Sequence, residues 1–155
     1  MITRRDLLRS FSLLAVAAGA MPMFSRIAVA ATTKPPVALF KNPGCECCDG
    51  YAAYLRKHGF VVTVRETPKL SDISANAGIS AEMQGCHTAF FGSYVVDGHV
   101  PIEAIDRLLA ERPPLKGLVL PGMPVGSPGM PGDKQAPFII YAVDREGNSA
   151  PYMTI

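Results

Sequence analysis

The sequence has no apolar run long enough to cross a membrane as a helix. Its longest such run lies within residues 11–20, whereas a membrane-spanning helix needs about 20 apolar residues. The segment after residue 30 also lacks a basic excess: it carries 11 basic and 12 acidic residues, for a net charge near −1. Without a cluster of Lys or Arg, it has no electrostatic footprint for binding nucleic acid. No long-period repeat indicates a second domain, and 155 residues have room for one.

The first 30 residues are typical of an export signal. Paired arginines (Arg4, Arg5) precede the apolar run, and the Ala-Val-Ala segment at residues 28–30 has small residues at the spacing that signal peptidase recognises. The start also resembles a twin-arginine signal, which exports folded proteins. A retained membrane anchor or a buried amphipathic helix is the alternative. We expect residues 1–30 to be a cleaved signal peptide and the mature protein to be periplasmic, with no membrane association after cleavage.

Apolar runs and turn residues predict an α/β fold. The first elements form a βαβ unit, which gives a parallel strand pair with a right-handed crossover. The inner order, β-α-β and then β-β-α, is the thioredoxin-like arrangement, in which helices flank a central mixed sheet. The expected inner elements are a strand at 37–40, a helix at 47–58, a strand at 60–64, a short helix at 71–78, a hairpin at 88–96 and a helix at 101–111.

Two further features are appended to this inner order. Residues 118–137 contain a run rich in Gly, Pro and Met, which cannot form a helix or a central strand. Residues 138–155 then predict a C-terminal β-hairpin. We therefore expect residues 37–155 to form one thioredoxin-like metal-binding domain.

The chain has four cysteines, and their spacing is informative. An exported protein with four cysteines would ordinarily form two structural disulfides. Here Cys45, Cys47 and Cys48 lie within four residues, and Cys86 stands alone. Neighbouring cysteines close almost no loop and their pairing is strained. One structural disulfide with two buried free thiols remains the structural alternative.

The three clustered cysteines lie between the first strand and its helix, where backbone N–H groups and the helix dipole stabilise thiolates. Cys45 and Cys48 form a C-x-x-C pair, which can form a reversible disulfide or chelate a soft metal. The additional Cys47 disfavours a dithiol oxidoreductase, because it invites wrong pairing. It also disfavours a mononuclear tetrahedral zinc site, because adjacent Cys47 and Cys48 are expected to converge badly. Cu(I) accepts two or three sulfur ligands and thiolates can bridge ions, so a polynuclear Cu(I)–thiolate cluster fits best.

Other residues are candidates to complete the site. Cys86 precedes the hairpin strand, and in thioredoxin-like folds this loop faces the C-x-x-C loop. His87 is expected to bind copper or to donate its N–H to a ligand. His99 is a weaker candidate, since a histidine at a helix start is often only a cap. Met123 and Met130 offer thioethers that suit Cu(I), but methionine is also a common gap filler.

Four ordered motifs carry a resemblance to a known family: residues 45–48 (CECC), 85–89 (GCHTA), 98–101 (GHVP) and 122–130 (GMPVGSPGM). Together they resemble the CopG-like periplasmic copper-resistance family, formerly catalogued as a domain of unknown function. The resemblance spans roughly residues 37–152. It implies a thioredoxin-like fold, copper binding through the C-x-C-C motif and the later cysteine, and a role in copper tolerance. A copper redox or thiol oxidoreductase activity is the mechanism suggested for that family.

The leading hypothesis is a Cu(I)-binding protein whose partners are copper ions and other periplasmic copper-handling proteins. A thiol–disulfide oxidoreductase using Cys45 and Cys48 is the alternative. Against it, Cys86-His87-Thr88 stands where a thioredoxin has a cis-proline before the hairpin strand. A structural domain with incidental cysteines is the third hypothesis. Whether the protein is an enzyme stays open at this point.

Overall fold

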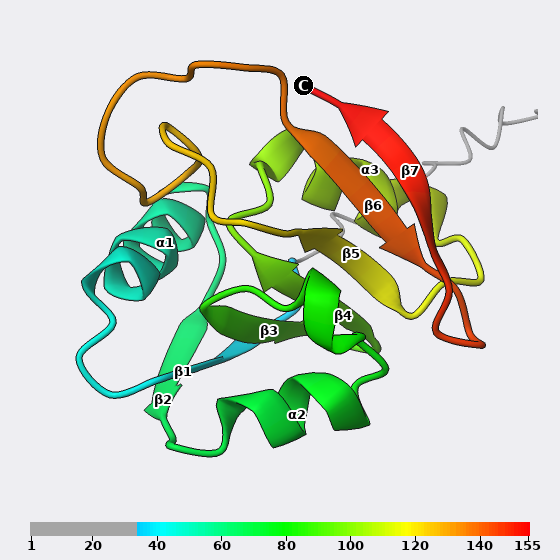
Figure 1. Cartoon of the computed structure of the whole chain (residues 1–155), viewed down its shortest axis with the longest axis horizontal. Coiled ribbons are helices and arrows are strands. Elements are labelled where there is room, and N and C mark those ends of the chain that lie inside the picture. Colours follow the sequence, from blue (N-terminus) through cyan, green and yellow to red (C-terminus); the bar gives the residue numbers. More distant parts are fainter. Residues whose placement is uncertain (1–33) are drawn as a thin grey trace, which may run out of the picture. The chain divides into compact units, whose positions relative to one another are not determined.

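A computed structural model describes residues 34–155, so the predicted signal peptide lies outside the described residues. The strands of this part form one seven-stranded sheet in the order β2-β1-β3-β4-β5-β6-β7 (Figure 1). The elements are β1 (Val37–Lys41), α1 (Glu46–Lys57), β2 (Val62–Glu66), α2 (Leu70–Asn76), the 3₁₀ turn η1 (Ala81–Met83), β3 (His87–Phe91), β4 (Tyr94–Gly98), α3 (Ile102–Glu111), β5 (Gly117–Leu120), β6 (Ile139–Val143) and β7 (Ser149–Thr154). The predicted α/β class, with a mixed sheet and flanking helices, is confirmed.

The sheet has a hydrophobic cluster on each face. The larger cluster packs α1 and α3 onto the sheet, with Tyr51 and Leu55 from α1 and Ile105 and Leu108 from α3 fully buried. Apolar residues recur along α3 at helical spacing, which explains why one side of this helix faces the sheet. The smaller cluster, on the other face of the sheet, contains Ile79, which lies shortly after α2 in the sequence. Among residues 34–155, no helix is both long and apolar enough to span a bilayer.

Strand direction brings distant loops to one edge of the sheet. β1 pairs antiparallel with β3, and β3 pairs antiparallel with β4, so β1 and β4 run in the same direction. β5 is parallel to β4. The carboxyl ends of β1, β4 and β5 therefore meet at the edge where β3 begins, which is where α/β sheets commonly bind ligands.

Most predicted elements are confirmed to within two residues, including the helix expected at 47–58 and the hairpin expected at 88–96. β5 was not predicted: for residues 118–137 only a Gly/Pro-rich run without helix or central strand was expected. It is short and runs directly into the Gly/Pro-rich segment, and it is held by β4 on one side and β6 on the other. The rest of that segment has no helix or strand, as expected, and the final hairpin of β6 and β7 is present.

Candidate metal centre

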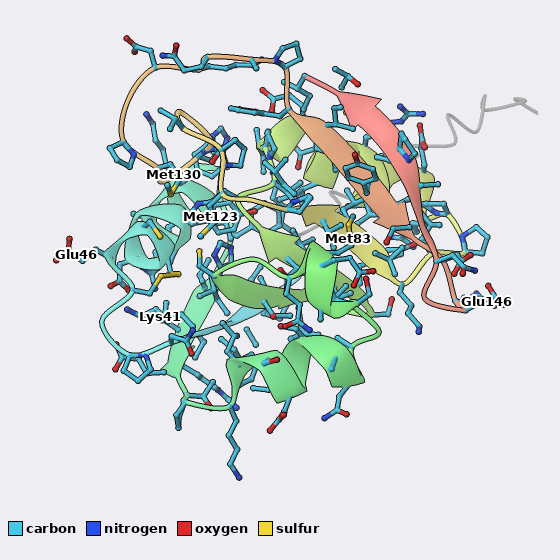
Figure 2. All side chains as sticks on the ribbon, viewed as in Figure 1. Lys41, Glu46, Met83, Met123, Met130 and Glu146 are labelled. Atoms are coloured by element: carbon cyan, nitrogen blue, oxygen red, sulfur yellow. A yellow bond between two sulfur atoms is a disulfide. The ribbon has the colours of Figure 1, made fainter. Side chains whose placement is uncertain are left out.

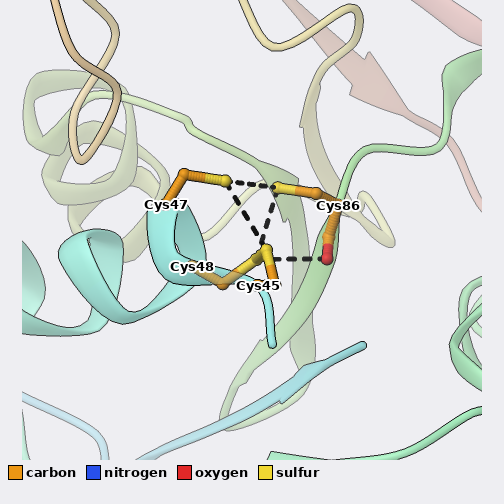
Figure 3. Close-up of side chains that lie close together, drawn as sticks. All are labelled: Cys45, Cys47, Cys48 and Cys86. Atoms are coloured by element: carbon orange, nitrogen blue, oxygen red, sulfur yellow. Dashed lines mark hydrogen bonds between the residues drawn. A yellow bond between two sulfur atoms is a disulfide. The ribbon is translucent and has the colours of Figure 1, made fainter. Parts of the chain in front are cut away.

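The four cysteines converge at the N-terminal end of α1 (Figure 3). Cys45 is the N-cap residue of α1, Cys47 and Cys48 lie in its first turn, and Cys86 directly precedes β3. The Cys47 sulfur is 3.5 Å from that of Cys45 and 3.7 Å from that of Cys86. The Cys48 and Cys86 sulfurs are 3.4 Å apart, and all four sulfurs lie within 4.8 Å of one another. Cys86 therefore faces the C-x-C-C loop as predicted.

The expectation that Cys47 and Cys48 would converge badly is wrong. Adjacent residues on an α-helix are rotated by about 100° around its axis, so both side chains can lie on the same half of the first turn. The Cys86 sulfur is within 3.7 Å of each of the two. The adjacency of Cys47 and Cys48 therefore does not argue against a four-coordinate site. The choice of metal depends on the softness of the sulfur ligands.

Cys45 and Cys48 are joined by a disulfide, and Cys47 and Cys86 are free thiols. The pair that bonds is the C-x-x-C pair, whose disulfide the sequence predicts to be reversible. Cys48 is fully buried, whereas Cys47 and Cys86 are partly exposed. Each free thiol thus lies next to a disulfide sulfur: Cys47 beside Cys45, and Cys86 beside Cys48.

The free thiol of Cys86 has an unusual environment. Burial, followed by the neighbouring Cys47, raises the pKa of Cys86 to about 12. At neutral pH Cys86 is therefore protonated in the metal-free protein, and a bound cation is needed to hold it as a thiolate.

His99 is oriented by the Gly/Pro-rich loop. Its Nδ1 lies 2.6 Å from the carbonyl oxygen of Pro128. A carbonyl can only accept a hydrogen bond, so Nδ1 carries the proton and Nε2 carries the lone pair. That Nε2 is 3.0 Å from the Cys86 sulfur. Burial lowers the pKa of His99, which keeps the ring neutral, and a neutral imidazole with one nitrogen held by a carbonyl is a typical arrangement for a metal ligand.

His87 follows Cys86 in the sequence, is fully buried, and its ring centroid is 4.9 Å from that of His99. Its Nδ1 is 3.5 Å from the Cys86 sulfur, and its Nε2 has no hydrogen-bond partner within residues 34–155. Burial, followed by the charge of His99, lowers the pKa of His87 to about 3. One donor atom each of Cys86, His87 and His99 falls within 4.8 Å of the others. Cys86 therefore belongs to two ligand sets, one of four sulfurs and one of sulfur and two nitrogens.

The loop that follows β5 packs closely against α1. Gly129 has φ +84°, and a Cβ at this position would lie 2.5 Å from the backbone nitrogen of Tyr51. A Cβ on Gly50 would likewise lie 2.9 Å from the carbonyl oxygen of Gly129. Two glycines thus allow the backbones to touch, and this contact places the Pro128 carbonyl at His99.

The two candidate methionines of this loop differ in position (Figure 2). Met130 lines a shallow pocket together with Glu46 and Cys47, at the opening of the cysteine site. Met123 is 40% exposed and does not line that pocket. Met130 therefore lines the same pocket as a cysteine, and Met123 does not.

Sequence reasoning missed Asp97, which supports the loop before β3. Its buried carboxylate accepts hydrogen bonds from the backbone N–H of Gly85 and from the hydroxyl of Thr88. The Thr88 hydroxyl also lies 2.6 Å from that of Ser74. This network holds both ends of the short segment that carries Cys86. Asp97 could have been identified from the sequence as a polar residue at an inward-facing position of an otherwise apolar strand.

Known proteins are similar to this chain in sequence and in fold. Residues 83–130 match the model of a family described as "Protein of unknown function, DUF411". No curated protein sequence matches the chain. Two solved structures, both named "Copper resistance protein copG", are similar with a TM-score of 0.73 each. Form 1 is 32% identical, and the match covers 79% of this chain and 98% of that chain. Form 2 is 33% identical, with 79% and 99% covered. The chain therefore belongs to the CopG-like copper-resistance family.

Proposed function

We propose that this chain is a periplasmic copper-binding protein that holds Cu(I) through the thiolates of Cys45, Cys47, Cys48 and Cys86. The convergence of the four sulfurs carries this proposal. Metal–sulfur bonds of about 2.3 Å separate the sulfurs of a tetrahedral site by about 3.8 Å, and the contacts between non-bonded sulfurs measure 3.4–3.7 Å. Soft thiolates bind Cu(I) and also zinc, so softness alone does not choose between these metals. Copper is the cargo, and the names of the similar structures support its identity.

A polynuclear site follows from the position of Cys86. Because this sulfur belongs to both ligand sets, its thiolate can bridge two copper ions. In this proposal His87 and His99 supply nitrogen ligands to the second ion, and His99 presents its Nε2 lone pair. Met130 adds a thioether at the opening of the site, and Met123 is the weakest candidate because of its exposure.

Loading of the full site requires reduction. The Cys45–Cys48 disulfide must take up two electrons before both sulfurs can bind Cu(I) as thiolates. The same couple balances a copper redox step: the two thiolates give one electron to each of two Cu(II) ions, and the disulfide and two Cu(I) ions result. A copper oxidoreductase activity is therefore part of the proposal.

Binding is tested by anaerobic titration of the reduced protein with Cu(I) in competition with a chromophoric chelator. We expect tight binding that weakens in each single Cys→Ser variant and is lost when all four cysteines are replaced. The unreduced protein, in which the disulfide is intact, is the matched control and should bind more weakly. Wild-type affinity in the variant without cysteines would contradict the proposal.

Export is a separate part of the proposal and has its own test. The paired arginines, the short apolar run and the Ala-Val-Ala segment support cleavage after Ala30. N-terminal sequencing of protein recovered from the periplasm should begin at Ala31. Protein that begins at Met1 and stays with the membrane fraction would contradict it.

A second candidate function is thiol–disulfide exchange with protein substrates. It is favoured by the disulfide of the C-x-x-C pair, in which Cys45 is partly exposed and Cys48 is buried, so that a substrate thiolate can reach Cys45. Insulin reduction by the metal-free protein separates the two functions. A copper carrier should be inactive, whereas activity that persists in Cys47→Ser and disappears in Cys45→Ser would favour the oxidoreductase.

A further inference from the structure

Lys41 is a buried cation at the base of the cysteine loop. It follows Leu39 on the inward face of β1, and its side chain is 3% exposed. The ammonium lies 3.3 Å from the carbonyl oxygen of Cys45 and 2.7 Å from a carboxylate oxygen of Asp49 in α1. It also lies 3.2 Å from a carboxylate oxygen of Glu66, at the end of β2. One side chain thus joins the cysteine loop, the first turn of the helix and the edge of the sheet.

The hydrogen bonds to Asp49 and Glu66 outweigh the burial of Lys41 and raise its pKa, but the two carboxylates do not themselves require a lysine at this position. The side chains of Asp49 and Glu66 are 58% and 55% exposed, so water can solvate both without an ion pair. Lys41 is the buried member, and burial of a charge is costly unless other groups compensate it. An apolar residue would continue the alternation of β1 at lower cost.

The position relative to α1 makes the lysine more unusual. The N-terminus of a helix carries the positive end of its dipole, which disfavours a nearby cation. Lys41 hydrogen-bonds to Cys45, the N-cap residue of α1, so it lies at this unfavourable end (Figure 2). The four cysteines lie at the same end of the helix. Reduced and deprotonated, they add anionic charge at the end of the helix where this cation lies.

We propose that Lys41 is a positioning residue of the thiolate site, which holds the Cys45–Asp49 turn on the sheet and offsets the negative charge of the copper-loaded cysteines. The inference rests on the proposed Cu(I) function. A site with fewer Cu(I) ions than thiolates is anionic, because each thiolate contributes one negative charge and each ion one positive charge. The ammonium is thus a fixed charge beside the site and is not itself a ligand.

The test compares variants that separate charge from structure. Lys41→Met removes the charge and keeps most of the side-chain volume, whereas Lys41→Arg retains the charge. Glu66→Gln is the matched control, because it breaks an ion pair of the same lysine without touching the cysteine loop. Cu(I) affinity of the reduced proteins is measured by chelator competition, and the thermal stability of the metal-free proteins is measured alongside.

We expect Lys41→Met to weaken Cu(I) binding on the order of tenfold, the effect of one charge removed close to a partly buried anion. Lys41→Arg should recover most of the affinity, and Glu66→Gln should leave it within about twofold. If Lys41→Met does not fold, Lys41→Gln carries the same test, since it keeps a donor for the Cys45 carbonyl. Wild-type affinity in the uncharged variant, or an equal loss in Glu66→Gln, overturns the role of Lys41. A wild-type protein that binds no Cu(I) in this assay overturns the proposed function together with it.

Discussion

His87 makes the stability of the metal-free protein depend on pH in a direction that the structure specifies. Its ring is buried against Tyr51 and His99, and burial together with His99 lowers the pKa of His87 from 6.5 to about 3. As the pH falls below 6.5, the unfolded chain takes up a proton that the folded protein does not accept until about pH 3. The unfolded state is therefore favoured increasingly across this window. The loss approaches about 1.4 kcal/mol for each pH unit and amounts to about 2.3 kcal/mol between pH 6.5 and pH 4.5.

Urea denaturation of metal-free protein at a series of pH values between about 7 and 4.5 measures this loss. His87→Gln cannot titrate at this position, so its free energy of unfolding should fall less steeply as the pH is lowered. The difference in slope from wild type corresponds to the uptake of up to one proton. His58→Gln is the control, because His58 is partly exposed at the C-terminal end of α1. Some slope should remain in His87→Gln, since burial also lowers the pKa of His99. Equal slopes in wild type and His87→Gln would refute the reasoning.

Three further predictions concern the packing around the site and are tested by urea denaturation. Gly129→Ala adds a Cβ against the Tyr51 nitrogen at positive φ and should cost more than about 2 kcal/mol, whereas Gly122→Ala, at φ +78° with open space, should cost about 1 kcal/mol. Equal losses would contradict the close approach of the loop to α1. Tyr51→Phe removes a hydroxyl that donates to the Val100 carbonyl at 2.9 Å and should cost about 1–2 kcal/mol; an unchanged midpoint would show that this bond contributes nothing. Leu39→Ala empties a fully buried position and should cost about 3 kcal/mol, and a loss below about 1 kcal/mol would mean that the core collapses into the gap.

The sequence predicts those parts of the fold that depend on local pattern. The strand before the cysteines, the helix after them and the hairpin after Cys86 all follow from apolar runs and turn residues. The position of Cys86 opposite the cysteine loop follows from the order of these elements. The all-sulfur set could therefore be identified before the structure was known.

Features that depend on partners far apart in sequence could not be predicted. β5 is only four residues long and is defined by its pairing with β4 and β6. The orientation of His99 depends on a carbonyl 29 residues away, in a loop without regular structure. Lys41 ends a strand, where a lysine is usually solvated, and only the packing of α1 shows that it is buried.

The central claim, that four sulfurs from two loops hold one soft-metal site, is tested most directly by X-ray absorption at the copper edge. Reduced protein loaded with Cu(I) should show a first shell dominated by sulfur, with a smaller nitrogen contribution that decreases in His99→Ala. A first shell of nitrogen and oxygen alone, or a spectrum that does not change when Cys86 is replaced by serine, would contradict it.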